Sequence, residues 1–164
     1  MQTGITPAEA LRTVLDETPV LRPETVSVRE ALGRVLAAPV VSERMLPPAD
    51  NSAMDGYAVR VADAGAAAPG SPVELRVVFE VAAGGASDAA VGPGQAARVL
   101  TGAPIPPGAD AVVMVELTEL GPTGESVRVE RSVPKGNHIR PAGDDVVTGD
   151  VVLEIGTRLG AAHL

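Results

Sequence analysis

Proline and glycine divide this 164-residue chain more finely than any other feature of its sequence does. There are 15 prolines and 18 glycines, and from residue 47 onward they bound short apolar runs, together with aspartate. Because proline and glycine interrupt helices and end strands, a chain divided in this way favours short strands joined by turns. The spacing predicts a small antiparallel β-barrel or β-sandwich.

Six apolar runs between these turn residues are predicted to form strands, because they are rich in valine and other apolar side chains. Residues 73–77 and 127–130 alternate apolar with polar side chains, so these two strands should each have one face in water. Residues 121–125 are predicted to connect a hairpin, and 62–72 and 82–93 to form surface loops. The predicted strands are 57–61, 73–81, 95–100, 111–117, 126–131 and 151–155, and the run 35–41 is also β-like.

Two capping patterns predict helices near the start of the chain. Thr6-Pro7-Ala8-Glu9 combines a hydroxyl acceptor, a first-turn proline and a glutamate that can close a capping box. An apolar stripe within residues 11–15 continues this helix to about Glu17, before prolines end it. A second capping pattern, Ser27-Val-Arg-Glu30, predicts a short helix through about Leu32.

The expected architecture is mainly β with short helices, in the α+β class. We expect an N-terminal helical segment at 1–26, a linker region formed by 27–46 and 147–164, and a β-rich barrel-like or sandwich-like domain at 47–146. The last residues, 156–164, look like the entry to a helix that stops before it can pack. We therefore expect the chain to be the N-terminal portion of a longer protein.

Composition excludes several classes of function. The only aromatic residues are Tyr57 and Phe79, so the core must be built from valine, leucine, isoleucine and alanine, and no aromatic platform exists for stacking bases. A net charge of −8 with a single lysine also argues against nucleic acid or an anionic membrane as a partner. The absence of cysteine excludes disulfides and thiolate metal sites.

Targeting signals are also missing from the pattern. The first seven residues lack both the basic start and the apolar run of a signal peptide. No segment approaches the roughly 20 apolar residues that a membrane-spanning helix requires. A cytoplasmic protein is the simplest interpretation.

Three segments rich in glycine and proline carry polar side chains suited to binding. They are 47–60, 101–110 and 136–145, here called the first, second and third segments, and each contains hydroxyl, carboxylate or guanidinium groups. Loops fixed by proline and glycine on a β scaffold are where proteins usually display binding groups. Three such segments in one small chain predict a single composite site.

The first segment carries two carboxylates, Asp50 and Asp55. Both stand in turn-forming pairs of residues, so each can be a simple turn former. Two carboxylates in a loop are also hard oxygen donors, which suit Mg²⁺ better than a soft metal. The residues by themselves leave both interpretations open.

The second and third segments offer groups for an anionic ligand. Arg140 has the planar fork that binds phosphate or other oxyanions through two hydrogen bonds, but it can equally pair with Asp144 or Asp145. Two adjacent acids of this kind are usually only solvated. The Thr101 hydroxyl can donate to an oxyanion or cap the local turn. Residue chemistry alone does not choose between these roles.

Three strings of residues in these segments together resemble one known family. The strings are Asp50-Asn-Ser-Ala-Met-Asp-Gly-Tyr-Ala58, Thr101-Gly-Ala-Pro104 followed by Pro106 and Gly108-Ala-Asp-Ala-Val-Val113 with Glu116, and Ile139-Arg140 before Gly143-Asp-Asp145. In this order they resemble the molybdopterin molybdenumtransferases, the MoeA and gephyrin E-domain family. The resemblance covers essentially the whole chain, so it is far more specific than one short motif.

This resemblance implies an enzyme that inserts molybdenum from molybdate into adenylylated molybdopterin and releases AMP, with Mg²⁺ as cofactor. It implies that Asp55 and Asp145 are catalytic and face the metal, and that Thr101 and Arg140 bind substrate. It also implies a homodimer whose β-rich domain faces the pterin-binding α/β domain of the other subunit, a domain that would begin near residue 156. The chain by itself is then expected to be inactive, because half of a shared site is missing.

Two positions depart from the family's pattern. Asp144 stands where the family has glutamate, so any role of that side chain is shortened in reach. Ala49 stands where the family commonly has an aromatic residue, so any contact made by that ring is absent. Neither change alters the Asp55 carboxylate.

A second hypothesis is a non-catalytic β-rich scaffold module whose loops bind a protein partner, as in the receptor-anchoring role of the gephyrin branch. A pure scaffold would not require Asp55, Thr101, Arg140 and Asp145 together. Their joint presence therefore favours the enzyme.

Overall fold

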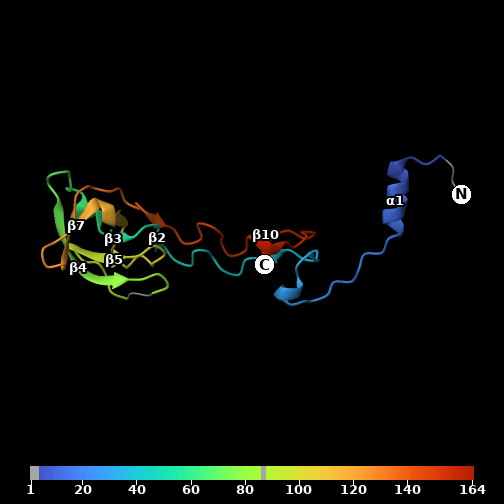
Figure 1. Cartoon of the computed structure of the whole chain (residues 1–164), viewed down its shortest axis with the longest axis horizontal. Coiled ribbons are helices and arrows are strands. Elements are labelled where there is room, and N and C mark those ends of the chain that lie inside the picture. Colours follow the sequence, from blue (N-terminus) through green and yellow to red (C-terminus); the bar gives the residue numbers. More distant parts are fainter. Residues whose placement is uncertain (1–3, 86–87) are drawn as a thin grey trace. The chain divides into compact units, whose positions relative to one another are not determined.

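The computed structural model describes residues 4–85 and 88–164, which divide into two compact units (Figure 1). The larger unit is Val41–Val152, and the smaller unit combines Met1–Val40 with Leu153–Leu164. A two-stranded sheet pairs β1 (Val40–Val41) with β10 (Val151–Leu153). The finer division expected from the sequence stays a prediction.

A six-stranded sheet in the order β6-β3-β5-β4-β8-β7 forms the body of the larger unit (Figure 1). Neighbouring strands are antiparallel except for β4 and β5, which run parallel. The mainly β class is confirmed, while the sheet is mixed and not purely antiparallel. Its strands are β3 (Gly56–Val59), β4 (Val73–Val81), β5 (Gln95–Val99), β6 (Ala111–Met114), β7 (Thr118–Leu120) and β8 (Ser126–Val129).

The parallel pair has a cause in the connection between its strands. A parallel pair needs a crossover of a dozen or more residues, and residues 82–94 supply it. Residues 86–87 of the predicted loop 82–93 lie outside the described residues. The described remainder of that loop contains neither helix nor strand, as expected.

The sheet buries side chains on both faces, because successive residues of a strand point to opposite sides. On β3, Tyr57 and Val59 belong to one apolar cluster and Ala58 to the other. A bulge between Val77 and Phe79 in β4 changes which face its apolar residues serve. Both clusters consist almost entirely of valine and alanine, with Leu75, Val59, Val99, Val112, Val113, Val127 and Val129 fully buried. The predicted aliphatic core is confirmed.

Several predicted strands end earlier in the structure, and after two of them the chain becomes helical. The strand predicted at 57–61 ends at Val59, and a short helix, α2 (Val61–Ala64), follows, so the predicted loop 62–72 is partly helical. Its first amide, that of Val61, donates to Asp110 Oδ1 at 2.7 Å, a contact from a distant loop that local patterning could not reveal. The strand predicted at 111–117 likewise turns into a 3₁₀ helix, η2 (Val115–Leu117).

The hairpin predicted around 121–125 is confirmed. It joins β7 to β8, which pair antiparallel with Leu120 opposite Val127. The strand β7 itself was not predicted, because it is only three residues long and has little apolar content. The strand predicted at 151–155 is shortened to β10, and of the β-like run 35–41 only β1 forms a named strand.

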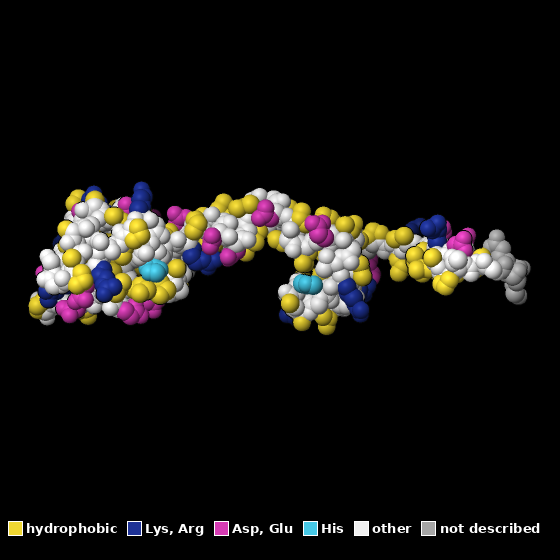
Figure 2. Space-filling view, turned by 90° about the horizontal axis from the view of Figure 1, so that it is seen from above, with side chains coloured by type: hydrophobic (Ala, Val, Ile, Leu, Met, Phe, Trp, Pro, Cys, Tyr) yellow, Lys and Arg dark blue, Asp and Glu magenta, His cyan; other side chains and the backbone are white. Residues whose placement is uncertain are grey.

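The smaller unit begins with α1 (Pro7–Glu17), which confirms the first predicted helix. The Thr6 amide donates to the Glu9 carboxylate at 2.8 Å, and the Glu9 amide donates to the Thr6 hydroxyl, so the capping box is complete. This carboxylate has a pKa below its ordinary value, mainly because of the Thr6 amide. The helix buries none of its residues, and Figure 2 shows yellow apolar side chains on its surface.

The other helical elements are single 3₁₀ turns. The second predicted helix reduces to η1 (Val28–Glu30), and η3 (Ala161–His163) lies near the end of the chain. Helices this short bury little and depend on their surroundings. Within residues 4–85 and 88–164, no helix is long and apolar enough to span a bilayer.

Candidate functional site

The fold brings the three polar segments together. A second two-stranded sheet pairs β2 (Asn51–Ser52) with β9 (Ile139–Arg140), which joins the first segment to the third. The Ser52 amide donates to the Ala103 carbonyl at 2.9 Å, and the Gly102 amide donates back to the Ser52 carbonyl at 2.8 Å. The first segment therefore lies between the second and the third.

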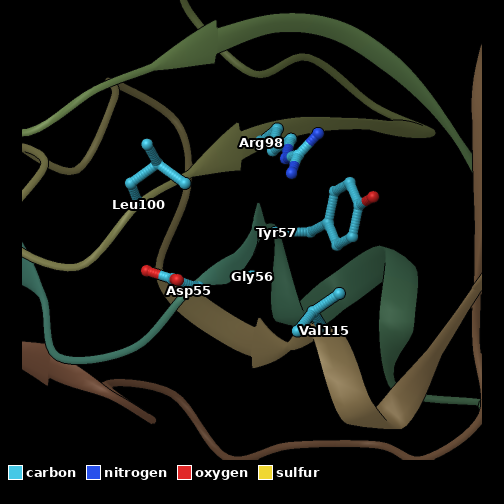
Figure 3. Close-up of a pocket in the computed structure, with 6 residues that line it drawn as sticks. All are labelled: Asp55, Gly56, Tyr57, Arg98, Leu100 and Val115. Atoms are coloured by element: carbon cyan, nitrogen blue, oxygen red, sulfur yellow. The ribbon is translucent and has the colours of Figure 1, made fainter.

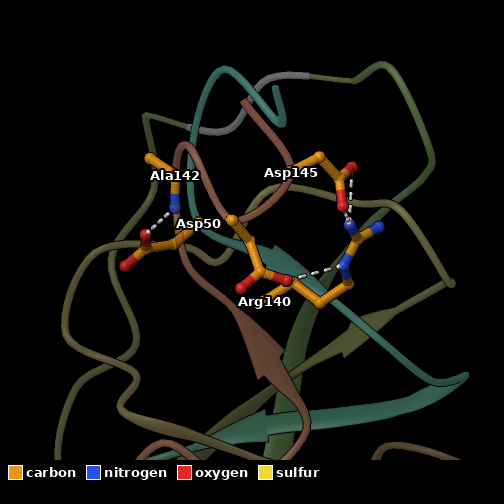
Figure 4. Close-up of polar contacts among 5 residues, drawn as sticks. Asp50, Arg140, Ala142 and Asp145 are labelled. Atoms are coloured by element: carbon orange, nitrogen blue, oxygen red, sulfur yellow. Dashed lines mark hydrogen bonds and ion pairs between the residues drawn. The ribbon is translucent and has the colours of Figure 1, made fainter. Parts of the chain in front are cut away.

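Asp50 reinforces this arrangement from within the first segment. Its Oδ1 accepts a hydrogen bond from the Ala142 amide at 2.8 Å, and its carbonyl accepts one from the Ile105 amide at 3.0 Å (Figure 4). Asp50 thus contacts both other segments and supports the loops. Neighbouring Gly143 has φ +75°, and a Cβ there would lie 2.8 Å from Val147 Cγ1. This close turn therefore requires glycine.

Asp55 stands immediately before β3, and Thr101 follows β5 after one residue. Because β3 and β5 are antiparallel, both residues lie at the same end of the sheet. Asp55 Oδ1 accepts hydrogen bonds from the Thr101 amide and the Thr101 hydroxyl, each at 2.7 Å. These two donors, the amide first, hold the pKa of Asp55 below its ordinary value of 3.8, so the carboxylate stays ionised. Thr101 therefore binds the Asp55 carboxylate directly.

Arg140 is engaged by two acids of its own segment (Figure 4). Its Nη2 donates to both carboxylate oxygens of Asp145, at 2.7 and 2.8 Å, and its Nε lies 3.5 Å from Asp144 Oδ2. The hydrogen bond and charge of Asp145, followed by those of Asp144, raise the pKa of Arg140 above its ordinary value. Of the two roles open from the sequence, pairing with the adjacent acids is the one this conformation adopts.

The predicted site residues form two separate clusters. One joins Asp55 to Thr101 and the other joins Arg140 to Asp145, and in the part of the chain that the structure describes no hydrogen bond or ion pair links the two. A small cleft of about 100 Å³ lies at the first cluster (Figure 3), and its lining residues are Asp55, Gly56, Tyr57, Arg98, Leu100 and Val115. The three segments converge, but Asp55 and Asp145 do not share this cleft.

A second hollow of about 270 Å³ is bordered mainly by glycine, proline and alanine, and most of its residues belong to the first and second segments. It is lined by Pro48, Ala49, Asn51, Gly84, Gly85, Gly102 and Pro104. Ligand pockets usually have about 300–1,000 Å³. Neither hollow by itself therefore has room for a ligand as large as an adenylylated pterin.

One residue of the cleft, Arg98, was missed by the sequence analysis. It lies on β5 between buried Ala97 and Val99, and its side chain is exposed. An arginine between apolar residues, three residues before Thr101, is the signal that could have identified it. It was overlooked because a polar residue in a strand is generally expected to face water and to have no further role.

The two clusters differ in what they leave for a cation. Among the described residues, no group of three or more histidine, cysteine, aspartate or glutamate side chains is placed to hold a metal ion. Mg²⁺ usually keeps several waters and needs only one or two protein carboxylates when substrate phosphates complete its shell. Asp55 fits this mode, because Thr101 engages only one of its oxygens. Asp145 fits poorly, because Arg140 engages both of its oxygens.

A mixed sheet whose adjoining loops bring three polar segments together defines a loop-bearing β domain. The chain belongs to the family described as the MoeA N-terminal region (domain I and II), whose sequence profile matches residues 5–164. The family resemblance noted in the sequence is therefore confirmed.

Relatives share this region at substantial identity. Molybdopterin molybdenumtransferase 2 of Mycobacterium tuberculosis (strain CDC 1551 / Oshkosh) is 44% identical over 148 residues, covering 90% of this chain and 36% of that protein. Molybdopterin molybdenumtransferase of Bacillus subtilis (strain 168) is 38% identical over 160 residues, covering 96% of this chain and 37% of that protein.

A solved structure has the same fold. The molybdopterin biosynthesis moeA protein from Pyrococcus horikoshii OT3 superposes with a TM-score of 0.87 at 43% identity, covering 94% of this chain and 41% of that chain. This chain therefore spans 36% to 41% of the lengths of these three relatives.

Proposed function

We propose that this chain is the N-terminal part of a molybdopterin molybdenumtransferase, which transfers molybdenum from molybdate to adenylylated molybdopterin and releases AMP. The observation that carries the proposal is the match of residues 5–164 to the family's N-terminal region, with relatives of that name at 36% to 44% identity. The convergence of the three polar segments supports it, because residues far apart in sequence then present their groups on one part of the domain.

Asp55 and Thr101 form the part of the site that we assign to the reacting groups. Thr101 fixes the orientation of Asp55 through two hydrogen bonds and keeps it ionised. The second oxygen of Asp55 is the group that would hold Mg²⁺, which when bound neutralises crowded oxyanions and polarises a phosphoryl group. A carboxylate whose orientation is already fixed loses less conformational freedom on binding a cation than a mobile carboxylate does.

Arg140 and Asp145 form the part that we assign to substrate recognition. The guanidinium of Arg140 has the geometry to bind a phosphate oxyanion, and Asp145 holds it in place until substrate arrives. A negative substrate would compete with Asp145 for the same donors. Asp145 therefore acts first as a positioning residue and, once released, as a carboxylate available to the substrate's cation.

We further propose a cytoplasmic homodimer in which each site is shared between subunits. The two hollows described here are both smaller than a typical ligand site, which supports a site completed by other parts of the assembly. The relatives extend well beyond the region matched here. The chain of 164 residues is therefore expected to show no turnover alone.

The test uses the full-length protein with adenylylated molybdopterin, molybdate and Mg²⁺. We expect one AMP to be released for each molybdenum incorporated, and neither product from the 164-residue chain. AMP is measured by chromatography and molybdenum by elemental analysis of the pterin product. Failure of the full-length protein to release AMP, or release without molybdenum incorporation, would refute the proposal.

A further inference from the structure

We propose that Arg98 binds an oxyanion of the substrate, a phosphate or molybdate group, in the cleft beside Asp55. This inference rests on the proposed function and adds a binding residue to it. Arg98 lines the same cleft as Asp55 but comes from a different strand (Figure 3). Three kinds of observation carry it: strand register, free hydrogen-bond donors, and the charge opposite.

Strand register places Arg98 beside Tyr57, on the face of the sheet that borders the cleft. Arg98 on β5 is directly paired with Tyr57 on β3, and Asp55 precedes Tyr57 by two residues. Directly paired residues of neighbouring strands point to the same side of a sheet, so Tyr57 and Arg98 share a face, and Asp55 lines the same cleft from the bend before β3. Farther along this face lies the aliphatic core, whereas at this end it opens into the cleft.

The guanidinium of Arg98 has donors to spare. Its ion pair is with Glu80, from Nε to Oε2 at 3.4 Å, and within the described residues its guanidinium makes no hydrogen bond of good geometry. The side chain is 54% exposed. Arg140, by contrast, donates to both oxygens of Asp145. An arriving oxyanion therefore meets less competition at Arg98 than at Arg140.

The charge opposite Arg98 suits a substrate oxyanion that arrives with a cation. Asp55 is held by Thr101 with its second oxygen left over, and its pKa is lowered by the Thr101 hydrogen bonds and, to a smaller degree, by the charge of Arg98. A carboxylate beside a guanidinium can accept the cation while the guanidinium accepts the oxyanion. This pair of charges would orient a phosphate or molybdate group in one direction.

The experiment measures binding of two probes, molybdate and inorganic phosphate, to the full-length protein by calorimetry, with Mg²⁺ present. We expect Arg98→Gln to weaken binding about tenfold, the usual scale for losing a charge-assisted contact. Arg128→Gln is the matched control, because Arg128 also lies on a strand of this sheet and pairs with a glutamate at 3.4 Å. It should change binding by no more than about twofold, as a surface pair away from the cleft.

A second variant is expected to strengthen probe binding. Glu80→Gln removes the carboxylate that competes for Arg98, so it should tighten binding of both probes by about two- to fivefold. Circular dichroism establishes that each variant is folded. Binding by Arg98→Gln within twofold of the unaltered protein, or no binding of either probe to the unaltered protein, would overturn the inference.

The inference and the proposed function fail in different ways. If the full-length protein inserts molybdenum and Arg98→Gln leaves both insertion and binding unchanged, only the role of Arg98 is wrong. If the protein inserts no molybdenum but Arg98→Gln still weakens probe binding, the cleft is an oxyanion site and the proposed reaction is wrong.

Discussion

Asp55 and Asp145 are both exposed aspartates in glycine- and proline-rich loops, yet their surroundings differ. The partners of Asp55 are neutral, an amide and a hydroxyl of Thr101, which fix the carboxylate without cancelling its charge. The partner of Asp145 is the Arg140 guanidinium, which takes both oxygens and cancels the charge. The difference teaches that similar motif residues can have different surroundings: Thr101 engages a single oxygen of Asp55, whereas Asp145 holds an arginine with both of its oxygens.

Removing the Asp55 carboxylate should have the largest effect of any change at these clusters. Asp55→Ala in the full-length protein is expected to lower the rate of molybdenum insertion about 100-fold or more, as for loss of a group that acts on the reacting atoms. Asp63→Ala is the control, because Asp63 also accepts a hydrogen bond from a distant backbone amide, that of Gly94. A comparable loss in both variants would mean that the effect is structural.

The next effect should come from the other cluster. Asp145→Ala leaves Arg140 without its bidentate partner, so insertion is expected to fall about tenfold because the guanidinium is no longer positioned. Asp144→Ala should cost only about two- to threefold, since its contact is longer, at 3.5 Å. Equal losses in the two variants would contradict the ranking of these acids. Steady-state insertion rates at saturating molybdate measure both.

The pKa of Asp55 offers a smaller but sharper test. Thr101→Val removes the hydroxyl donor and keeps the amide, so the pKa should rise toward 3.8 while staying below it. Since the folded pKa is lowered, these hydrogen bonds stabilise the fold above the ordinary pKa, and that stabilisation is lost as the pH falls through the lowered value. Carboxyl-carbon NMR titration measures the shift. An unchanged pKa in Thr101→Val would mean that the hydroxyl does not bind Asp55 in solution.

The smallest effect is expected from placing at position 144 the glutamate that the family resemblance implies. Asp144→Glu lengthens the side chain by one methylene but keeps its charge, so insertion should change by no more than about twofold. The side chain is exposed, and it contacts Arg140 only through Nε. A gain of tenfold or more would show that the shorter acid limits this protein, and that Asp144 belongs with the substrate-binding groups.

Much of the fold could be predicted because it depends on local pattern. The capping box of α1, the strand 73–81 and the hairpin at 121–125 all follow from periodicity, turn chemistry and capping. The errors occur where distant contacts decide. Val61 begins a helix because Asp110 accepts its amide, and the chain after Met114 leaves the sheet. The residues next to Val61 and Met114 in the sequence do not indicate either of these changes in secondary structure.

The candidate site divides in the same way. The sequence indicated the polar groups and the segments that carry them, and it offered both roles for Arg140. It could not rank these roles, because the choice depends on whether Asp145 reaches the guanidinium. It also missed Arg98, because its place in the cleft depends on its pairing with Tyr57 of the neighbouring strand.

The order of short apolar runs, capping residues and turn formers by itself determined a mainly β chain with an aliphatic core and three polar loops, because these properties depend on neighbours along the chain. Only the tertiary structure decided that Thr101 serves Asp55, that Arg140 is held by Asp145, and that Arg98 faces the cleft. Those pairings depend on strand register and on hydrogen bonds between segments up to about 90 residues apart, such as that of Asp50 with Ala142. A linear pattern specifies which groups are present, and packing specifies which of them meet.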